Sequence, residues 1–453
     1  MGEEQEQKFH QLTEEPVSRV ISHLAVPCII SMLVTAFTTW RTPFCGDAAQ
    51  QRCHWRCGRG VFHDGGDPGC GLFLRPRQRQ LHLPGAGAAQ YGFGLQHGGH
   101  RLFLRPVHRT PHLRFRRDLP DAPGRVPGLL PTILPYAKDY LRVILIGAPW
   151  MTASLVLNNQ LRFQGNAIYG TIGIASGAVL NIGLDPLLIF VFDLGVAGAA
   201  WATIISQFAG FCLLLAGCTR GATLHIHISR VQLKWSYFKL IIQGGLPSLA
   251  RQSLASVATI CLNHAAMPYG DAAIAAMGVV QRITTFGASA MIGFGQGFQP
   301  VCGFNYGARL YHRVKEGFWF CVKVAAVFLL VIGALGFAFA PQLIALFRDD
   351  PGVIAIGTVA LRFQCVTFFF QAWITMSNMM LQTIGRTVPA TFVAMARQGI
   401  FFIPLVWLLS LSPLGLLGVQ MAQSVSDLLT LAAAVPIQLY VLRQMSQMQP
   451  AKV

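Results

Sequence analysis

The sequence predicts an all-α membrane protein that crosses the bilayer many times. Hydrophobic residues make up 53% of its 453 residues and charged residues only 12%, which is far from the balance of a soluble domain. Apolar runs of about 20 residues recur along the chain, and this is the length that a helix needs to span a bilayer. Basic residues gather in alternate connections between these runs, as they do in positively charged cytoplasmic loops.

The predicted spans follow a polar, acidic beginning, MGEEQEQKFHQLTEE, which lacks the features of a cleavable leader. The first span is therefore expected to stay as an anchor. Several later runs contain Gly or Pro, which membrane helices tolerate when neighbouring groups satisfy the backbone. The ten predicted spans are 17–40, 134–157, 167–191, 194–218, 237–263, 272–299, 316–341, 352–381, 388–409 and 413–441.

The basic residues predict the orientation of these spans. They follow alternate spans, and the opposite connections are nearly free of Lys and Arg. Because positive loops stay in the cytoplasm, we expect both termini and the linker 219–236 on the cytoplasmic side of the plasma membrane. The gap between the first two spans must then hold an even number of crossings. The residues concerned are Arg162, Arg220, Arg230, Lys234, Arg309, Arg313, Lys315, Arg386, Arg443 and Lys452.

Residues 41–128 differ from the rest of the chain. They hold 14 of the 28 Arg, 7 of the 13 His and 4 of the 11 Cys, and they contain no Lys, Glu, Ser, Ile, Met or Asn. A disordered linker would favour Ser, Lys and Glu. Nucleic-acid binding is disfavoured because Lys is absent and membrane spans flank the window. Zinc binding is disfavoured because the Cys and His spacing fits no paired pattern, and a disulfide-rich outer loop is a third alternative.

An out-of-frame translation explains the composition of this window best. Arg, Gly, Pro and His are the residues that a GC-rich gene yields in the wrong frame. Read one base later with suitable codons, RCHWRCGRGVF becomes ATGAVGVVF, and HRLFLRPVHRTPHLRF becomes TGFFSGPFTGLLISV. The shifted text is apolar and restores two membrane helices, as the topology allows. We therefore interpret 41–128 as an out-of-frame segment that replaces the second and third helices.

The legible stretches keep a distinctive order and spacing: LAVPCIISMLVTAF, TILPYAKDYLRVILIGAPWMTASLVLNNQLRFQGNA, VLNIGLDPLLIF, GVAGAAWATIISQ, GFGQGFQPVCGFNYGA and MARQGIFFIPLVWLLSLSPLGLLGVQMAQSVSD. Together they resemble the multidrug and toxic compound extrusion (MATE) family, over residues 12–40 and 129–445. The resemblance implies twelve helices in two six-helix lobes, about ten of them legible here. It also implies export of drugs, often organic cations, in exchange for protons or sodium ions.

An internal repeat supports the two lobes. GAAWATIISQF at 198–208 aligns with GVQMAQSVSDL at 418–428, which sets Ser206 opposite Ser426. Internal repeats around a central cavity are a common plan of transporters. The predicted organisation is a cytoplasmic tail at 1–16, an N-lobe at 17–218, a cytoplasmic linker at 219–236, a C-lobe at 237–441 and a cytoplasmic tail at 442–453.

Asp185 is the main candidate for a functional site, because a carboxylate at membrane depth is costly and by default functional. Asn181 lies one helical turn earlier on the same face, and Pro186 deprives a nearby carbonyl of its helical hydrogen bond. Carboxylate, amide and carbonyl oxygens suit a hard cation, and burial adapts a carboxyl group to proton exchange. The alternative is that Asn181 and Asp185 only cap or bridge helices.

The family resemblance assigns Asn181, Asp185 and Thr203 to a coupling-cation site of the N-lobe, for protons or sodium ions. It also implies an acid on the first helix. This chain lacks that acid as written and carries it only in shifted text, where TTWRTPF at 38–44 can be read as NMADTF.

In the C-lobe, Asp427 is the other carboxylate at membrane depth and a candidate second acid. Its alternative role is a structural hydrogen bond to a neighbouring helix. Arg397 also lies deep, and its segment MARQG echoes LARQS at 249–253. A substrate cavity facing anionic or zwitterionic groups is one interpretation of the deep polar residues, and pairing with backbone carbonyls, with Asp427 or within tight helix packing is the other. The candidate cavity residues are Arg251, Gln252, Arg282, Gln296 and Gln299.

The function that we expect is secondary active efflux of drugs or organic cations. No cluster of catalytic groups and no GKS/T phosphate loop occurs in the sequence, so neither an enzyme nor an ATP-driven pump is expected. We expect no cofactor or structural metal besides the coupling proton or sodium ion, and no nucleic-acid partner; the partners are small drugs and membrane lipid. The alternatives are a flippase for lipids or lipid-linked saccharides and a non-functional product of a damaged reading frame.

Overall fold

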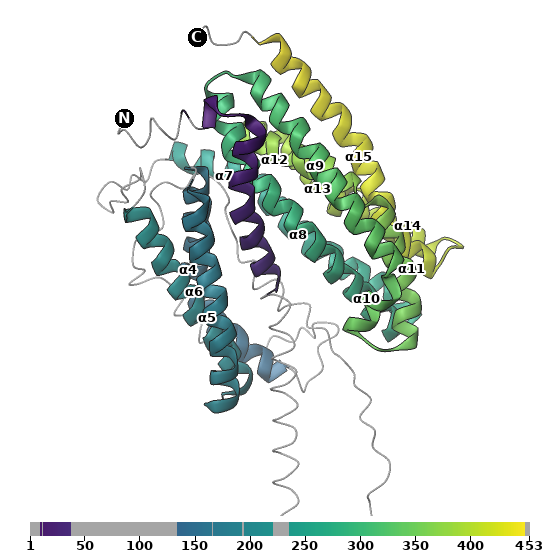
Figure 1. Cartoon of the computed structure of the whole chain (residues 1–453). Helices are drawn as coiled ribbons and strands as arrows, with labels where there is room; N and C mark the ends of the chain where they lie inside the picture. Colours follow the sequence, from purple (N-terminus) through teal and green to yellow (C-terminus); the bar gives the residue numbers. More distant parts are fainter. Residues whose placement is uncertain are drawn as a thin grey trace, which may run out of the picture.

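The computed structural model describes residues 10, 12–37, 134–164, 166–192, 194–220 and 235–448. Every regular element within these ranges is a helix, so the predicted all-α fold is confirmed (Figure 1). The window 41–128, the interpretation of its reading frame and the expected acid of the first helix lie outside the described residues.

The described helices are long and apolar enough for a multi-pass membrane protein. Six of them pass a test of length and hydropathy for a membrane span, and a bent pair of helices passes it jointly. Helices α4, α7 and α8, also predicted as spans, contain 30, 32 and 37 residues but are not among those six. Their polar, Gly and Pro residues lower their hydropathy.

The N-lobe contains three long described helices after the N-terminal helix Val17–Phe37. Helix α6 packs against both α4 and α5, and glycines allow this close approach. A Cβ placed on Gly173 of α5 would lie 2.5 Å from the Leu214 side chain of α6. The elements are α4 (Leu134–Phe163), α5 (Ala167–Pro186), the π-helix η2 (Leu187–Val191) and α6 (Gly195–Arg220).

The C-lobe departs from the predicted spans at two places. The predicted span 352–381 is two helices bent by 58°, and a short helix that was not predicted, α10, precedes it. Asp350 starts α11, since its Oδ1 accepts from the N–H groups of Gly352 and Val353. The elements are α7 (Trp235–Ala266), η4 (Met267–Tyr269), α8 (Asp271–Gly307), α9 (Tyr311–Ala338), α10 (Ala340–Phe347), α11 (Pro351–Thr367), α12 (Phe370–Thr383), α13 (Thr387–Met395), η5 (Ala396–Ile400), α14 (Phe402–Leu411) and α15 (Leu416–Gln447).

The two lobes repeat each other's contacts at a constant offset of 220 residues. The side-chain amide of Asn158 donates to the Gly170 carbonyl at 3.0 Å, and that of Asn378 donates to the Ala390 carbonyl at 2.7 Å. The last helix of each lobe also begins at a glycine of positive φ, 54° in one and 53° in the other. The offset is the same as in the sequence alignment of 198–208 with 418–428. These two glycines are Gly195 and Gly415.

The N-terminal helix lies between α4–α6 and the C-lobe (Figure 1). Much of its buried face belongs to the same hydrophobic cluster as α8, α9 and α12. Gly293 and Gly297 of α8 form a small-xxx-small face, and a Cβ on either would lie 2.6 Å from a backbone Cα of the N-terminal helix. The N-terminal helix therefore packs directly against the backbone of α8 in the C-lobe.

Replacing Gly297 with Ala should loosen this contact, because the new methyl would lie 2.6 Å from the backbone of Ala25. Overpacking costs about 1–3 kcal/mol of unfolding free energy, and the buried Cys28 beside the contact should react faster with a maleimide. Gly307→Ala is the matched control, because nothing lies within 4 Å of its Cβ. Thermal unfolding and mass spectrometry of the labelled Cys28 peptide measure both effects. Identical behaviour of the two variants would contradict the contact.

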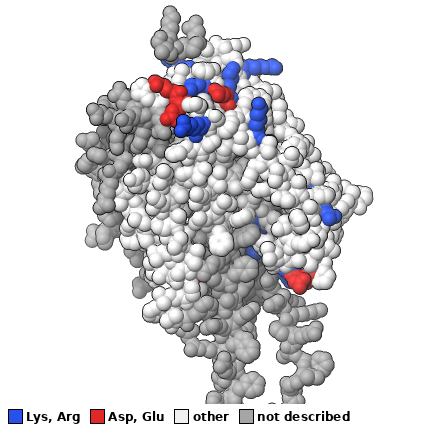
Figure 2. Space-filling model, viewed as in Figure 1, with Lys and Arg blue, Asp and Glu red and all other residues white. Residues whose placement is uncertain are grey.

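Charged residues gather at the end of the described structure where the N-terminal helix begins and α15 ends (Figure 2). Arg313 donates to the Glu15 carbonyl, Lys315 Nζ lies 2.7 Å from Ser446 Oγ, and Arg386 donates to Gln444. Both ends of the described chain therefore lie on the same side of the helix bundle.

Candidate functional site

Asp185 and Asp427 are the buried carboxylates of the described residues. Asp185 is 1% exposed, while Val179, on another face of α5, is 66% exposed. Asn181 Nδ2 donates to Asp185 Oδ1 at 3.2 Å. The predicted acid–amide pair therefore forms, and the carboxylate faces the interior of the lobe.

Thr203 lies at the depth of this pair on the neighbouring helix. A Cβ on Gly177 of α5 would lie 3.0 Å from the Ser206 carbonyl of α6, and one on Gly198 of α6 would lie 2.7 Å from the Leu188 carbonyl. Between these two contacts the antiparallel helices bring Thr203 level with the acid–amide pair. Its buried hydroxyl donates to the carbonyl four residues earlier in α6, at 2.9 Å.

The backbone next to Asp185 is irregular. Pro186 has no N–H, so the Ile182 carbonyl loses its helical partner, and the chain continues as the π-helix η2, in which the N–H of Phe192 donates to Leu187. Single π-turns inside helices occur frequently at functional sites. The carboxylate, amide and hydroxyl of these residues and the freed carbonyl are all oxygen-bearing groups of the kind that suits a hard cation.

Ser206 is a further polar group near this site, and sequence reasoning did not include it. Its hydroxyl is buried one turn after Thr203 and has no hydrogen-bond partner among the described residues. The equivalent Ser426 donates to the Arg397 carbonyl at 2.7 Å. The repeat alignment pairs these two serines, but it does not predict that, among the described residues, only Ser426 has a hydrogen-bond partner.

The site helix is tied to the N-terminal helix at Pro27. Thr171 Oγ1 of α5 donates to the Pro27 carbonyl at 2.8 Å. The same N-terminal helix contacts α8 through its other face. The N-terminal helix therefore contacts both α5, through this hydrogen bond, and α8 of the C-lobe.

Asp427 forms a polar network of its own in the C-lobe. Its Oδ1 accepts from Arg397 Nε at 2.8 Å and from Gln423 Nε2 at 3.0 Å, and its Oδ2 accepts from Gln371 Nε2 at 3.1 Å. The carboxylate is 2% exposed, and the Arg397 side chain 28%. In the structure, Asp427 makes the contact to a neighbouring helix that was one of its two predicted roles. This contact is an ion pair with Arg397.

The candidate cavity residues occupy different environments. Gln296 is half-buried, and its Nε2 approaches Met32 Sδ of the N-terminal helix at 3.6 Å. Gln299, on the same helix, is buried. Arg251 is exposed on α7, whereas Gln252 beside it and Arg282 on α8 are half-buried. Arg162, counted with the basic loops, is instead buried at the end of α4 and donates to Asn159 at 2.5 Å.

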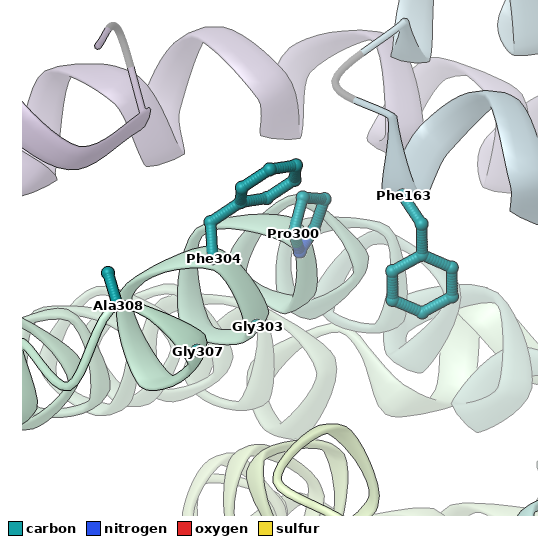
Figure 3. A pocket seen from close by; sticks show the side chains of 6 residues that line it. All are labelled: Phe163, Pro300, Gly303, Phe304, Gly307 and Ala308. Carbon is teal, nitrogen blue, oxygen red and sulfur yellow. The ribbon is translucent and has the colours of Figure 1, made fainter. Parts of the chain in front are cut away.

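A hollow of about 490 Å³ separates the lobes at the charged end of the molecule. Phe163 of α4 lies on one side, and Pro300 and Phe304 of α8 lie on the other (Figure 3). The lining is apolar or glycine, with Gly303, Gly307 and Ala308 completing it. This hollow is a boundary between the lobes, and both buried carboxylates lie elsewhere.

The repeated lobes, with a buried acid–amide pair beside a π-turn, define a multi-pass membrane protein of the transporter type. The family model MatE matches residues 125–187 and 247–408, about half of the chain. The chain belongs to this family, the MATE transporters. The matched ranges begin after most of the Arg-rich window.

Similar proteins indicate the same family. Multidrug export protein MepA of Staphylococcus haemolyticus is 28% identical over 287 residues, or 63% of each chain, so the match spans less than two thirds of that relative. The MepA of Staphylococcus saprophyticus is 28% identical over 314 residues, or 68% of each chain. A solved MOP superfamily transporter from Pyrococcus furiosus has a TM-score of 0.79 at 21% identity, over 97% of this chain and 98% of that one. At this identity the likeness shows the fold.

Proposed function

We propose that the in-frame form of this chain exports cationic drugs across the plasma membrane in exchange for protons or sodium ions. By in-frame form we mean the protein in which 41–128 is replaced by its frame-shifted reading. The buried Asp185, bonded to Asn181 at 3.2 Å and level with Thr203, carries the proposal. A carboxylate at membrane depth has a functional role by default, and its surrounding oxygens suit a proton or a sodium ion.

Coupling in this proposal runs through the N-terminal helix. Cation binding at Asp185 changes the charge beside the irregular backbone at Pro186, and Thr171 connects this helix to Pro27. Pro27 interrupts the hydrogen bonding of the N-terminal helix, so a change of kink there would move the surface that packs on Gly293 and Gly297. The two lobes would then separate on one side of the membrane.

The proposed orientation places both termini in the cytoplasm. The basic residues Arg313, Lys315 and Arg386 lie at the end of the molecule where both described chain ends meet. Positive charge of this kind stays on the cytoplasmic side. The apolar hollow at Phe163 would then lie near the cytoplasmic boundary between the lobes.

Export of cationic dye, compared with translocation of a lipid-linked saccharide, tests this function against the flippase alternative. Cells that express the in-frame form should retain less ethidium than cells with the empty vector, and a gradient uncoupler should abolish the difference. Translocation of a labelled lipid-linked precursor should stay at the vector level. The reverse pattern, lipid movement without dye export, would favour the flippase.

A further inference from the structure

The short motif Ala-Arg-Gln occurs at 250–252 and at 396–398, and the structure places the two copies on neighbouring helices. Helix α7 packs along α13, η5 and α14. A Cβ on Gly399 would lie 2.5 Å from Leu254, and the ring centroids of His264 and Trp407 are 6.4 Å apart. From the first contact to the second, the residue numbers increase in both helices, so the two helices run parallel. The arginines of the two motifs therefore lie at about the same depth.

Arg397 is held in place by Asp427. Its Nε donates to Oδ1 at 2.8 Å, and Gln423 and Gln371 supply the remaining hydrogen bonds of that carboxylate. With three donors and 2% exposure, Asp427 is held inside this network, and we assign it the role of orienting the guanidinium. Only Nε takes part in this contact, so the end-on edge of Arg397, which consists of the two terminal nitrogens, is left for another acceptor.

The Arg397 side chain is only partly buried. Arg397 lies near the middle of the span Thr387–Leu411, and 28% of its side chain is exposed. An arginine at this depth faces a water-filled interior or a ligand, because exposure to lipid costs several kcal/mol. Arg251, at the same depth on α7, is also exposed, and a second positive charge there strengthens attraction for an anion.

The repeat indicates that the ion pair is not needed to join these helices. At the offset of 220 residues, Arg397 and Asp427 correspond to Gly177 and Gln207 of the N-lobe. There the glycine lets the two helices touch directly at the Ser206 carbonyl. The same helix contact is therefore made without charge in one lobe and, in the other, carries an ion pair whose carboxylate is buried.

We propose that Arg397, oriented by Asp427 and flanked at its depth by Arg251, binds the carboxylate of a transported substrate. A guanidinium edge and a carboxylate form two parallel charge-assisted hydrogen bonds. The substrate class is therefore carboxylate-bearing apolar molecules, zwitterionic drugs among them. This inference rests on the proposed export function for its biological meaning, but the binding site is a property of the C-lobe.

Binding of dansylglycine by the purified full-length chain in detergent, compared with dansylglycinamide, tests the proposal. The two fluorescent probes differ only in the carboxylate. The acid should bind about tenfold more tightly, which is the effect of one charge-assisted contact. Arg397→Gln with Asp427→Asn should remove this preference and leave the affinity for the amide unchanged. Arg362→Gln is the matched control, because that exposed arginine lies over Phe337 instead and its loss should leave the preference intact.

Two single variants separate recognition from folding. Arg397→Lys keeps the charge beside Asp427 but lacks the two-pronged edge, so the preference should fall to an intermediate value in a protein of normal melting temperature. Asp427→Asn, a positioning change, should weaken the preference without altering amide binding. Equal affinity of the wild-type chain for both probes, including no measurable binding of either, would overturn the proposal. So would a preference that survives in the double variant. Dye export enters none of these readouts, so failure of the export function remains distinguishable.

Discussion

Asp185→Asn should reduce drug export by the in-frame form to the background of cells without the transporter. The amide keeps the shape of the side chain and can still hydrogen-bond to Asn181, so expression and folding should persist. It carries neither the negative charge that attracts a cation nor a proton that can be exchanged. The measurement is the minimum inhibitory concentration of cationic drugs in cells with matched amounts of the two proteins.

Asp349→Asn is the control for this change. Asp349 is an exposed acid in the loop between α10 and α11, so the same substitution there should leave resistance intact. If the Asp185 variant instead conferred wild-type resistance, the coupling site would lie elsewhere, and Asp427 would be the next acid to test.

The chain as printed should not transport at all, whereas its in-frame form should. A window with 14 Arg cannot supply two membrane helices, because each Arg at the bilayer centre costs about 2.5–3.5 kcal/mol. The N-lobe would lack two helices, and the coupling site would lack the acid that the family resemblance places on the first helix. Resistance conferred by the two coding sequences, expressed at equal levels, gives the comparison.

Resequencing the gene gives an independent check of the same prediction. We expect the corrected DNA to encode apolar helices in place of residues 41–128. Confirmation of the printed window in the DNA, together with resistance from the printed chain, would show that the two helices and the missing acid are dispensable.

Local patterns in the sequence predicted most of the helices and the acid–amide pair. Asn181 and Asp185 are four residues apart on one helix, so helical geometry alone brings them together. The broken span between α11 and α12 was missed because its three consecutive phenylalanines, 368–370, are as apolar as a continuous helix. In the structure the break is marked by backbone hydrogen bonds that span three residues, among them the N–H of Gln371 donating to the Phe368 carbonyl.

Contacts between distant segments could be predicted only as alternatives. Arg397 and Asp427 are 30 residues apart on different helices, so periodicity could not decide whether they pair or face substrate. The contact of the N-terminal helix with Gly297 of α8 depends on how the two lobes pack together. No local sequence pattern predicts that packing. Ser206 likewise looks the same in sequence as its partnered counterpart Ser426.

Dye movement into proteoliposomes tests most directly the claim that Asp185 couples drug export to a cation gradient. The in-frame form would be reconstituted, and the accumulation of a fluorescent cationic dye followed under an imposed proton gradient and, separately, a sodium gradient. We expect dye accumulation that requires one of the gradients and that falls to the level of empty liposomes in the Asp185→Asn variant. Accumulation that needs neither gradient, or that the variant retains in full, would contradict it.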